Sequence, residues 1–117
     1  RVMVNPGGLN EKFANENLTH ATVIVHPKNE EIPSLIAEGE ADVMITEITE
    51  APWYVQNDVR LAAPLLAAPF THGEIGVLMS KGQDDLLALV NGVIAQMKAD
   101  GTLRRLHEKY GLIYAYE

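Results

Sequence analysis

The spacing of apolar and polar positions predicts alternating strands and helices in the first part of the chain. Short apolar runs bounded by turn residues predict strands at positions 2–4, 21–26, 41–46 and 58–63, the last being the least apolar. Between them, apolar residues recur at helical spacing and predict helices over 11–18, about 29–38 and within 47–57. This order predicts an α/β fold with a parallel sheet flanked by helices.

Single residues mark the ends of these predicted helices. Pro33 suits only a first turn, and Gly39 is placed to end the second helix. We expect Asn10, Asn29 and Thr49 as N-caps, because such side chains accept hydrogen bonds from free helical N–H groups.

The second part of the chain is mainly helical. After an Ala- and Pro-rich connector at 62–69, the pattern predicts a strand at 75–79, a long helix over 84–99 and a short helix over 102–110. These elements cannot bury the apolar face of the long helix, which consists of Leu86, Leu87, Val90, Val93, Ile94 and Met97. Either they pack on the first sheet or they need more polypeptide. We favour the second alternative, and expect a homo-oligomer or segment exchange through the helices of 84–110.

Positions 2–13 combine an apolar strand, a glycine turn and the start of a helix. Pro6, Gly7 and Gly8 end the strand and allow a tight backbone. Glu11 lies in the first helical turn, where a carboxylate favours the helix dipole. Free N–H groups at such a turn can bind an anion, so the stretch predicts a pocket for a small carboxylate or phosphate. The alternative is a turn that any α/β unit needs; neither GxxxxGK[ST] nor GxGxxG is present.

Length and composition narrow the possible functions. The 117 residues suffice for one domain with a core, and 9 basic against 16 acidic side chains give a net charge of −7. This charge argues against a nucleic acid or an anionic membrane as partner. The sequence contains no cysteine, no membrane span and no signal peptide. Because it opens on Arg1 and enters a strand at once, we expect a piece of something longer.

Two phrases of the sequence resemble a known family. NPGG at 5–8 with NEKFA at 10–14, followed by GEADVMITE at 39–47, resembles the cyclohexadienyl dehydratase branch of the type 2 periplasmic solute-binding proteins. Segments near the end are similar to the closing segment of amino-acid-binding members of that superfamily; they lie at 69–71, 80–82, 100–103 and 109–111. The likeness runs along nearly all of the chain.

The resemblance implies a periplasmic-binding-protein-like fold of type II, in which two α/β lobes enclose the ligand. It places positions 1–69 in lobe two and positions 70–117 in the segment that returns to lobe one. The opening portion of lobe one, with the arginine that binds the ligand carboxylate, has no counterpart in these 117 residues. The resemblance also implies a periplasmic location.

The resemblance further implies the dehydration and decarboxylation of prephenate or arogenate. A ring hydroxyl and carbon dioxide leave, and a general acid has to protonate the hydroxyl because hydroxide is a poor leaving group. No metal or organic cofactor is implied, and metal-ligand spacing is lacking in His20, His26, His72 and His107. The expected partner is a small anionic molecule, namely prephenate, arogenate or an amino acid.

Glu47 and Glu50 are the candidate catalytic acids. Both follow the third predicted strand at its C-terminal end, where open α/β sheets hold ligands. The resemblance aligns Glu47 with an acidic residue that binds a ligand amino group, and Glu50 with a carboxylate often seen in the dehydratase branch; we rank Glu47 slightly ahead. The alternative is that acids before a helix only favour its dipole. The expected ligand-binding residues are Asn5, Gly8, Leu9, Asn10 and Thr46.

Two positions depart from the family pattern. Leu9 stands where many relatives have threonine, so only its backbone N–H can bind a ligand carboxylate, and Glu47 stands where relatives often have aspartate. Three interpretations follow: a cyclohexadienyl dehydratase, a solute-binding module for an amino acid or small carboxylate without catalysis, and a folded lobe inactive alone. Donors from the opening portion of lobe one supply part of the affinity, so we expect poor or no catalysis by these 117 residues as they stand.

Overall fold

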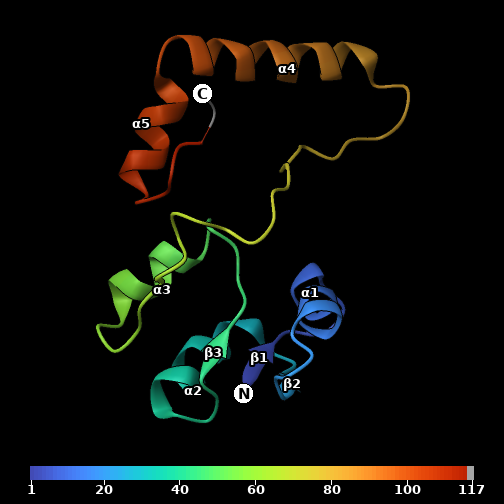
Figure 1. The fold of residues 1–117 in the computed structure, drawn as a ribbon. Helices are drawn as coiled ribbons and strands as arrows, with labels where there is room; N and C mark the ends of the chain where they lie inside the picture. Colours follow the sequence, from blue (N-terminus) through green and yellow to red (C-terminus); the bar gives the residue numbers. More distant parts are fainter. Residues whose placement is uncertain (116–117) are drawn as a thin grey trace. The chain divides into compact units, whose positions relative to one another are not determined.

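The computed structural model describes residues 1–115 of the chain. The chain divides into two compact units, Arg1–Leu66 and Ala67–Glu117, which Figure 1 colours from blue to yellow and from yellow to red. The assignment of these units to lobe two and to the returning segment of lobe one stays a prediction.

The first unit is built around a three-stranded parallel sheet in the order β2-β1-β3. Val2 of the central strand lies beside Val23 on one side and Val43 on the other. The predicted parallel sheet is confirmed, although its outer strands are shorter than the apolar runs. The strands are β1 (Val2–Val4), β2 (Val23–Val25) and β3 (Val43–Met44).

Helices and one 3₁₀ turn connect these strands. α1 follows β1, η1 and α2 follow β2, and α3 follows β3. The order of elements is therefore the predicted one as far as α3. Their bounds are α1 (Leu9–Asn17), η1 (Asn29–Glu31), α2 (Ile32–Glu38) and α3 (Ala51–Asn57).

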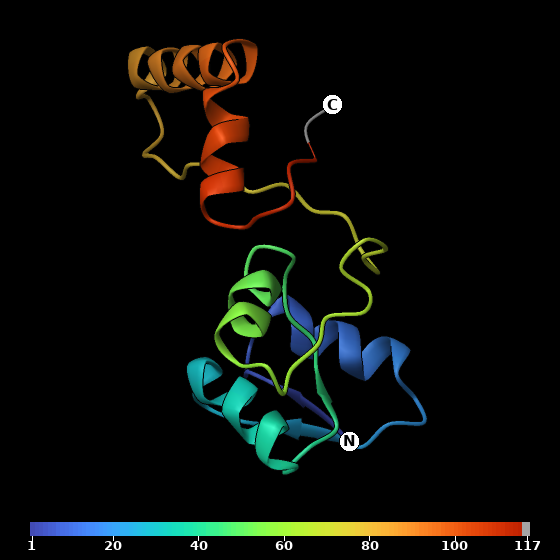
Figure 2. The same ribbon diagram turned by 90° about the vertical axis from the view of Figure 1, so that its left-hand side faces the viewer.

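The two faces of the sheet carry separate small cores. Side chains alternate along a strand, so β1 buries two residues against α1 and one against α2. Figure 2 shows α1 and α2 on opposite sides of the strands. Because the central strand is covered on both faces, it is apolar at every position. The buried residues are Val2, Val4 and Ala14 on one face and Met3, Ile32 and Ala41 on the other.

The predicted N-caps of α1 and α3 are wrong. The backbone of Gly8 is extended (φ −104°, ψ 178°), so α1 begins one residue before Asn10 and Gly8 is its N-cap. Glu50, not Thr49, is the N-cap of α3. In neither helix does the side chain of the N-cap residue accept a capping hydrogen bond.

For α2, two predictions are confirmed and the predicted N-cap is wrong. Asn29 is the first residue of the 3₁₀ turn η1, which leads directly into α2, and the N-cap of α2 is Glu31. Pro33 lies in the first turn, and Gly39 ends the helix in the left-handed conformation (φ 85°), both as predicted.

The strand predicted at 58–63 is wrong. Asp58 Oδ1 accepts a 3.0 Å hydrogen bond from the backbone N–H of Arg60, and its two oxygens accept bonds of 2.9 and 2.6 Å from the Arg60 guanidinium. An aspartate that binds the backbone two residues on closes a turn and competes with strand pairing. Val59 at this turn is 97% exposed.

The second unit contains two helices that contact each other. α4 (Asp84–Ala99) has the predicted bounds, and α5 (Thr102–Lys109) ends one residue earlier than predicted. Gly101 between them has a φ of 77°, which lets the chain leave one helix and enter the next. Within residues 1–115, no helix is both long and apolar enough to cross a membrane.

The strand predicted at 75–79 is also wrong. Val77 and Leu78 of this segment are 63% and 98% exposed, and residues 67–115 contain no strand with which it could pair. An unpaired strand leaves its backbone N–H and C=O groups without partners, so apolar patterning alone does not form one.

The second unit leaves its apolar side chains largely uncovered. None of its described residues, 67–115, is buried, and Leu89 on α4 is 64% exposed. Two contacting helices do not bury the long apolar face, as expected. What covers that face stays a prediction.

Candidate functional site

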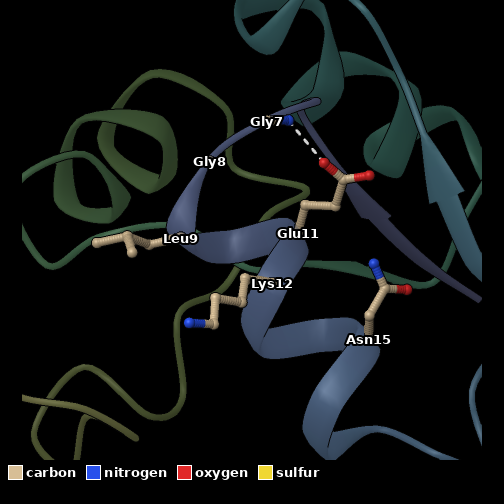
Figure 3. A pocket seen from close by; sticks show the side chains of 6 residues that line it. All are labelled: Gly7, Gly8, Leu9, Glu11, Lys12 and Asn15. Atoms are coloured by element: carbon tan, nitrogen blue, oxygen red, sulfur yellow. Dashed lines mark hydrogen bonds between the residues drawn. The ribbon is translucent and has the colours of Figure 1, made fainter.

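The glycine turn after β1 binds a carboxylate of its own chain. Gly7 has a φ of 75°, a conformation that residues with side chains rarely adopt. Its backbone N–H donates a 2.6 Å hydrogen bond to Oε2 of Glu11, the dashed line in Figure 3. Glu11 thus favours the positive end of α1 and also closes the turn, in a variant of the capping box. The Gly7 N–H is therefore already occupied, and only the backbone N–H groups that follow it can bind an anion as predicted.

An open hollow of about 520 Å³ lies beside this turn. In Figure 3 the side chains of Leu9 and Lys12 extend in the same direction, whereas Glu11 bends back to Gly7. Leu9 is 79% exposed, so the position that many relatives fill with threonine presents an apolar group to solvent. The hollow is lined by Gly7, Gly8, Leu9, Glu11, Lys12 and Asn15.

Only some of the predicted ligand-binding residues line this hollow. Gly8 and Leu9 line it, whereas Asn10 and Thr46 do not. Asn5 lies close by, since its Nδ2 atom is 3.6 Å from the point that a Cβ on Gly8 would occupy. The sequence reasoning missed Lys12, although its place three residues after Leu9 on a helix was a usable signal.

The loop after β3 holds the Glu50 carboxylate in place. Oε2 of Glu50 accepts a 2.6 Å hydrogen bond from the Thr46 hydroxyl and lies 3.5 Å from the Tyr54 hydroxyl. Glu50 and Tyr54 are half-buried, and they lie one helical turn apart at the start of α3. Thr46 and Glu50, both expected at the site, are thus in direct contact. The sequence reasoning missed Tyr54, which four-residue spacing from Glu50 could have indicated.

Glu47 has different surroundings. It is exposed, and its contact with the Thr49 hydroxyl is long, at 3.4 Å. The two candidate acids therefore differ: Glu50 is half-buried and held in one orientation, whereas Glu47 stands in solvent.

The Tyr54 hydroxyl keeps its proton more strongly than an ordinary tyrosine. Partial burial raises the pKa of Tyr54, and the negative charge of Glu50 and the hydrogen bond to it raise the pKa further. Over the neutral range the phenol is therefore a hydrogen-bond donor to Glu50.

Both groups of candidate residues follow neighbouring strands. β1 leads into the glycine turn, β3 leads into the loop of Thr46 to Glu50, and the two strands pair in parallel. The carboxyl ends of adjacent parallel strands lie at the same edge of a sheet, where α/β proteins bind ligands. The hollow itself is lined only from the β1 side, so these residues share an edge but not one enclosed pocket.

Histidine and acidic side chains elsewhere have structural contacts. His26 Nε2 lies 2.9 Å from Oε2 of Glu31, and Lys28 Nζ lies 2.7 Å from its other oxygen. Lys28 first and His26 second lower the pKa of Glu31. Among residues 1–115, no three His, Asp or Glu side chains group together as metal ligands would.

Comparison with known proteins covers nearly the whole chain. The family of bacterial extracellular solute-binding proteins, family 3, matches residues 11–113. Cyclohexadienyl dehydratase of Pseudomonas aeruginosa is 40% identical over 81 residues, which are 69% of this chain and 30% of that protein. L-cystine-binding protein TcyJ of Escherichia coli is 51% identical over 41 residues, which are 35% of this chain and 15% of that protein. The chain thus matches less than a third of the length of these relatives.

The family match extends from the first turn of α1 to beyond the end of α5. It confirms the resemblance carried by the two phrases at 5–14 and 39–47, and the identity to a cyclohexadienyl dehydratase supports the branch. The parallel sheet with helices on both faces agrees with a type II periplasmic-binding-protein fold. This chain belongs to the bacterial extracellular solute-binding proteins of family 3.

Proposed function

We propose that this chain provides part of the active site of a cyclohexadienyl dehydratase-like protein, which dehydrates and decarboxylates prephenate or arogenate. The observation that carries the proposal is the half-buried Glu50 carboxylate, held by a 2.6 Å hydrogen bond at the carboxyl edge of the sheet. The 40% identity to a dehydratase supports it. We further propose a periplasmic location, because the family is named for extracellular solute-binding proteins.

In this proposal Glu50 is the general acid. The ring hydroxyl must be protonated as it leaves, and a general acid contributes roughly 10²–10⁴-fold to such a step. Partial burial and a fixed orientation suit Glu50 for this role better than the exposed Glu47. This reverses the order favoured by the sequence.

The anionic part of the ligand is assigned to the glycine turn. The first N–H groups of α1 have no partners within the helix, so Gly8, Leu9 and Asn10 can offer amides to a carboxylate. Asn5 beside Gly8 can add a side-chain donor. Leu9 contributes only its backbone, since its side chain has no hydrogen-bonding group.

Turnover of prephenate tests the proposal. In a family-length protein carrying this segment, Glu50→Gln should lower kcat by roughly 10²-fold or more, because an amide cannot donate the proton. Glu47→Gln is the matched control and should cost less than Glu50→Gln. Phenylpyruvate absorbance follows the product. An active Glu50→Gln variant would contradict the role of Glu50, and no turnover by the unmodified protein would contradict the activity.

The second candidate function is capture of an amino acid or small carboxylate without catalysis. An exposed carboxylate such as Glu47 can bind a ligand ammonium, and 51% identity over 41 residues links the chain to a protein named for binding L-cystine. Calorimetry against amino acids and prephenate separates the functions. Tight binding of an amino acid with no turnover favours this second candidate.

A further inference from the structure

The hydrogen bonds to the Glu50 carboxylate fall on only one of its oxygens. Thr46 Oγ1 donates to Oε2 at 2.6 Å, and the Tyr54 hydroxyl lies 3.5 Å from the same atom. Within residues 1–115, no side chain donates a hydrogen bond to Oε1 of Glu50. The two oxygens therefore have different surroundings.

We propose that Thr46 and Tyr54 are positioning residues that fix Oε2 of Glu50 and leave Oε1 as the oxygen that meets the ligand. Thr46 precedes Glu50 by four residues in the loop after β3, and Tyr54 follows it by four residues within α3. A loop and a helix thus hold one oxygen between them. The contact between Oε1 and a ligand rests on the proposed function, whereas the positioning of Glu50 by Thr46 and Tyr54 does not.

The distances rank the two positioning residues. A 2.6 Å hydroxyl–carboxylate contact is in the range of strong, charge-assisted hydrogen bonds, whereas 3.5 Å is at the limit of hydrogen bonding. Thr46 is therefore the main positioning residue and Tyr54 the weaker one. Tyr54 stays a donor at neutral pH because burial first, and the charge of Glu50 second, raise the pKa of its phenol.

The arrangement restricts the chemical group that Oε1 can accept. With Oε2 occupied by donors, a protonated Glu50 carries its proton on Oε1, where it can be given to a ligand hydroxyl. An ionised Glu50 presents Oε1 as an acceptor for a hydroxyl or an ammonium group. A hydroxyl can therefore face Oε1 in both states, and an ammonium can face it when Glu50 is ionised, whereas the ligand carboxylate is assigned to the glycine turn.

The carboxyl signal of Glu50 in the 117-residue chain tests the positioning directly. Carboxyl-¹³C glutamate labelling, with the Glu50 signal assigned through Glu50→Gln, reports the hydrogen bonding of this carboxylate at neutral pH. Thr46→Val removes the 2.6 Å donor and should shift the Glu50 signal. Thr46→Ser keeps the hydroxyl and should restore the original signal, and Tyr54→Phe should give a smaller shift than Thr46→Val.

A matched control separates positioning from general effects of substitution. Thr49→Val removes a hydroxyl that faces Glu47, so it should leave the Glu50 signal unchanged. Other charges near the cluster are Glu30, which acts on Tyr54 from η1, and the neighbouring Glu47; they are the same in every variant. Amide spectra establish that each variant is folded.

The outcomes distinguish this inference from the proposed function. An unchanged Glu50 carboxyl signal in folded Thr46→Val, or an equal shift in Thr49→Val, overturns the positioning role. If Thr46→Val does not fold, Thr46→Ser and Tyr54→Phe carry the test, and a Glu50 signal in Tyr54→Phe equal to that of the unmodified chain overturns the role of Tyr54. Shifts in the expected order without prephenate turnover by the family-length protein support the positioning and remove the dehydratase activity alone.

Discussion

Glu47 and Glu50 illustrate how surroundings decide the use of a side chain. They are three positions apart in one loop, yet Glu50 is half-buried under the Thr46 and Tyr54 hydroxyls while Glu47 is exposed. A carboxylate held in one orientation can transfer a proton reproducibly, whereas a solvated one samples many orientations. The chemistry of the loop is therefore decided by hydrogen bonds, not by the presence of an acid.

Glu11 has a structural role at the glycine turn, which substitution can measure. Glu11→Ala removes the acceptor of the Gly7 N–H and should lower the free energy of unfolding by about 1 kcal/mol. Glu16→Ala on the same helix is the control, because Glu16 makes only an exposed ion pair with Lys12 at 3.9 Å. Urea unfolding followed by fluorescence of Trp53, the single tryptophan, gives both values. Equal losses in the two variants would exclude a special role for Glu11.

Asp58 gives a pH dependence of defined sign. Hydrogen bonds from the Arg60 side chain first, and from its backbone second, lower the pKa of Asp58 from 3.8 to about 2. Because the folded state holds the charged form more strongly, this contribution to stability is complete above the unfolded pKa and is lost as the pH falls from 3.8 to about 2. We expect the unfolding free energy of Asp58→Asn to fall less steeply over this interval than that of the unmodified chain. Parallel curves for the two chains would contradict this prediction.

At the scale of elements, the central strand and the helices on its two faces define the first unit. β1 alternates its side chains between α1 and α2, so each helix packs on its own small core. Pairing with β2 and β3 places the glycine turn and the Glu50 loop at one edge. The candidate site therefore depends on the packing of α2 even though α2 contributes no candidate residue.

Ile32 is the side chain through which α2 is anchored. It is completely buried against Met3 and Ala41, so Ile32→Ala should lower the unfolding free energy by about 2–5 kcal/mol. Val25→Ala, at a position 46% exposed on β2, is the control and should change it by only about 0.5 kcal/mol. Urea unfolding monitored by circular dichroism measures both. A small loss for Ile32→Ala would mean that α2 is not anchored there.

At the scale of the whole molecule, the apolar face of α4 is the main apolar surface left exposed to solvent. None of the described residues of the second unit is buried, whereas the first unit has a core on each face of its sheet. Burial of apolar surface drives association at about 25 cal/mol per Å², so a further polypeptide covering α4 would be stabilising. We propose a second copy of the chain, or an exchanged segment, as that cover.

Light scattering tests this assembly. The unmodified chain should show dimers or larger species whose fraction rises with concentration. Leu86→Lys with Val93→Lys places two charges on the apolar face of α4 and should shift the population toward monomers. Val59→Lys is the control, at a turn position 97% exposed in the first unit. A monomer at all concentrations would contradict the proposal.

The sequence by itself determined the elements whose pattern is local or fully buried. The VMV run predicted a central strand, helical spacing predicted the exact bounds of α4, and Gly39 predicted the end of α2. The phrases at 5–14 and 39–47 determined the family, which the match to residues 11–113 confirmed. These features depend on backbone preferences and on apolar periodicity, which the order of residues specifies directly.

Tertiary structure alone decided which apolar runs became strands and what surrounds each candidate residue. Residues 75–79 are as apolar as a strand, but a strand needs a neighbour and none lies within residues 67–115; at 58–63 a side-chain bond from Asp58 forms a turn instead. Likewise, only the folded path of the chain from the loop after β3 into α3 placed Thr46 and Tyr54 on one oxygen of Glu50 and left Glu47 in solvent. Strand pairing and burial come from partners distant in the chain, and the path of the backbone decides which neighbouring side chains meet; a linear pattern specifies neither.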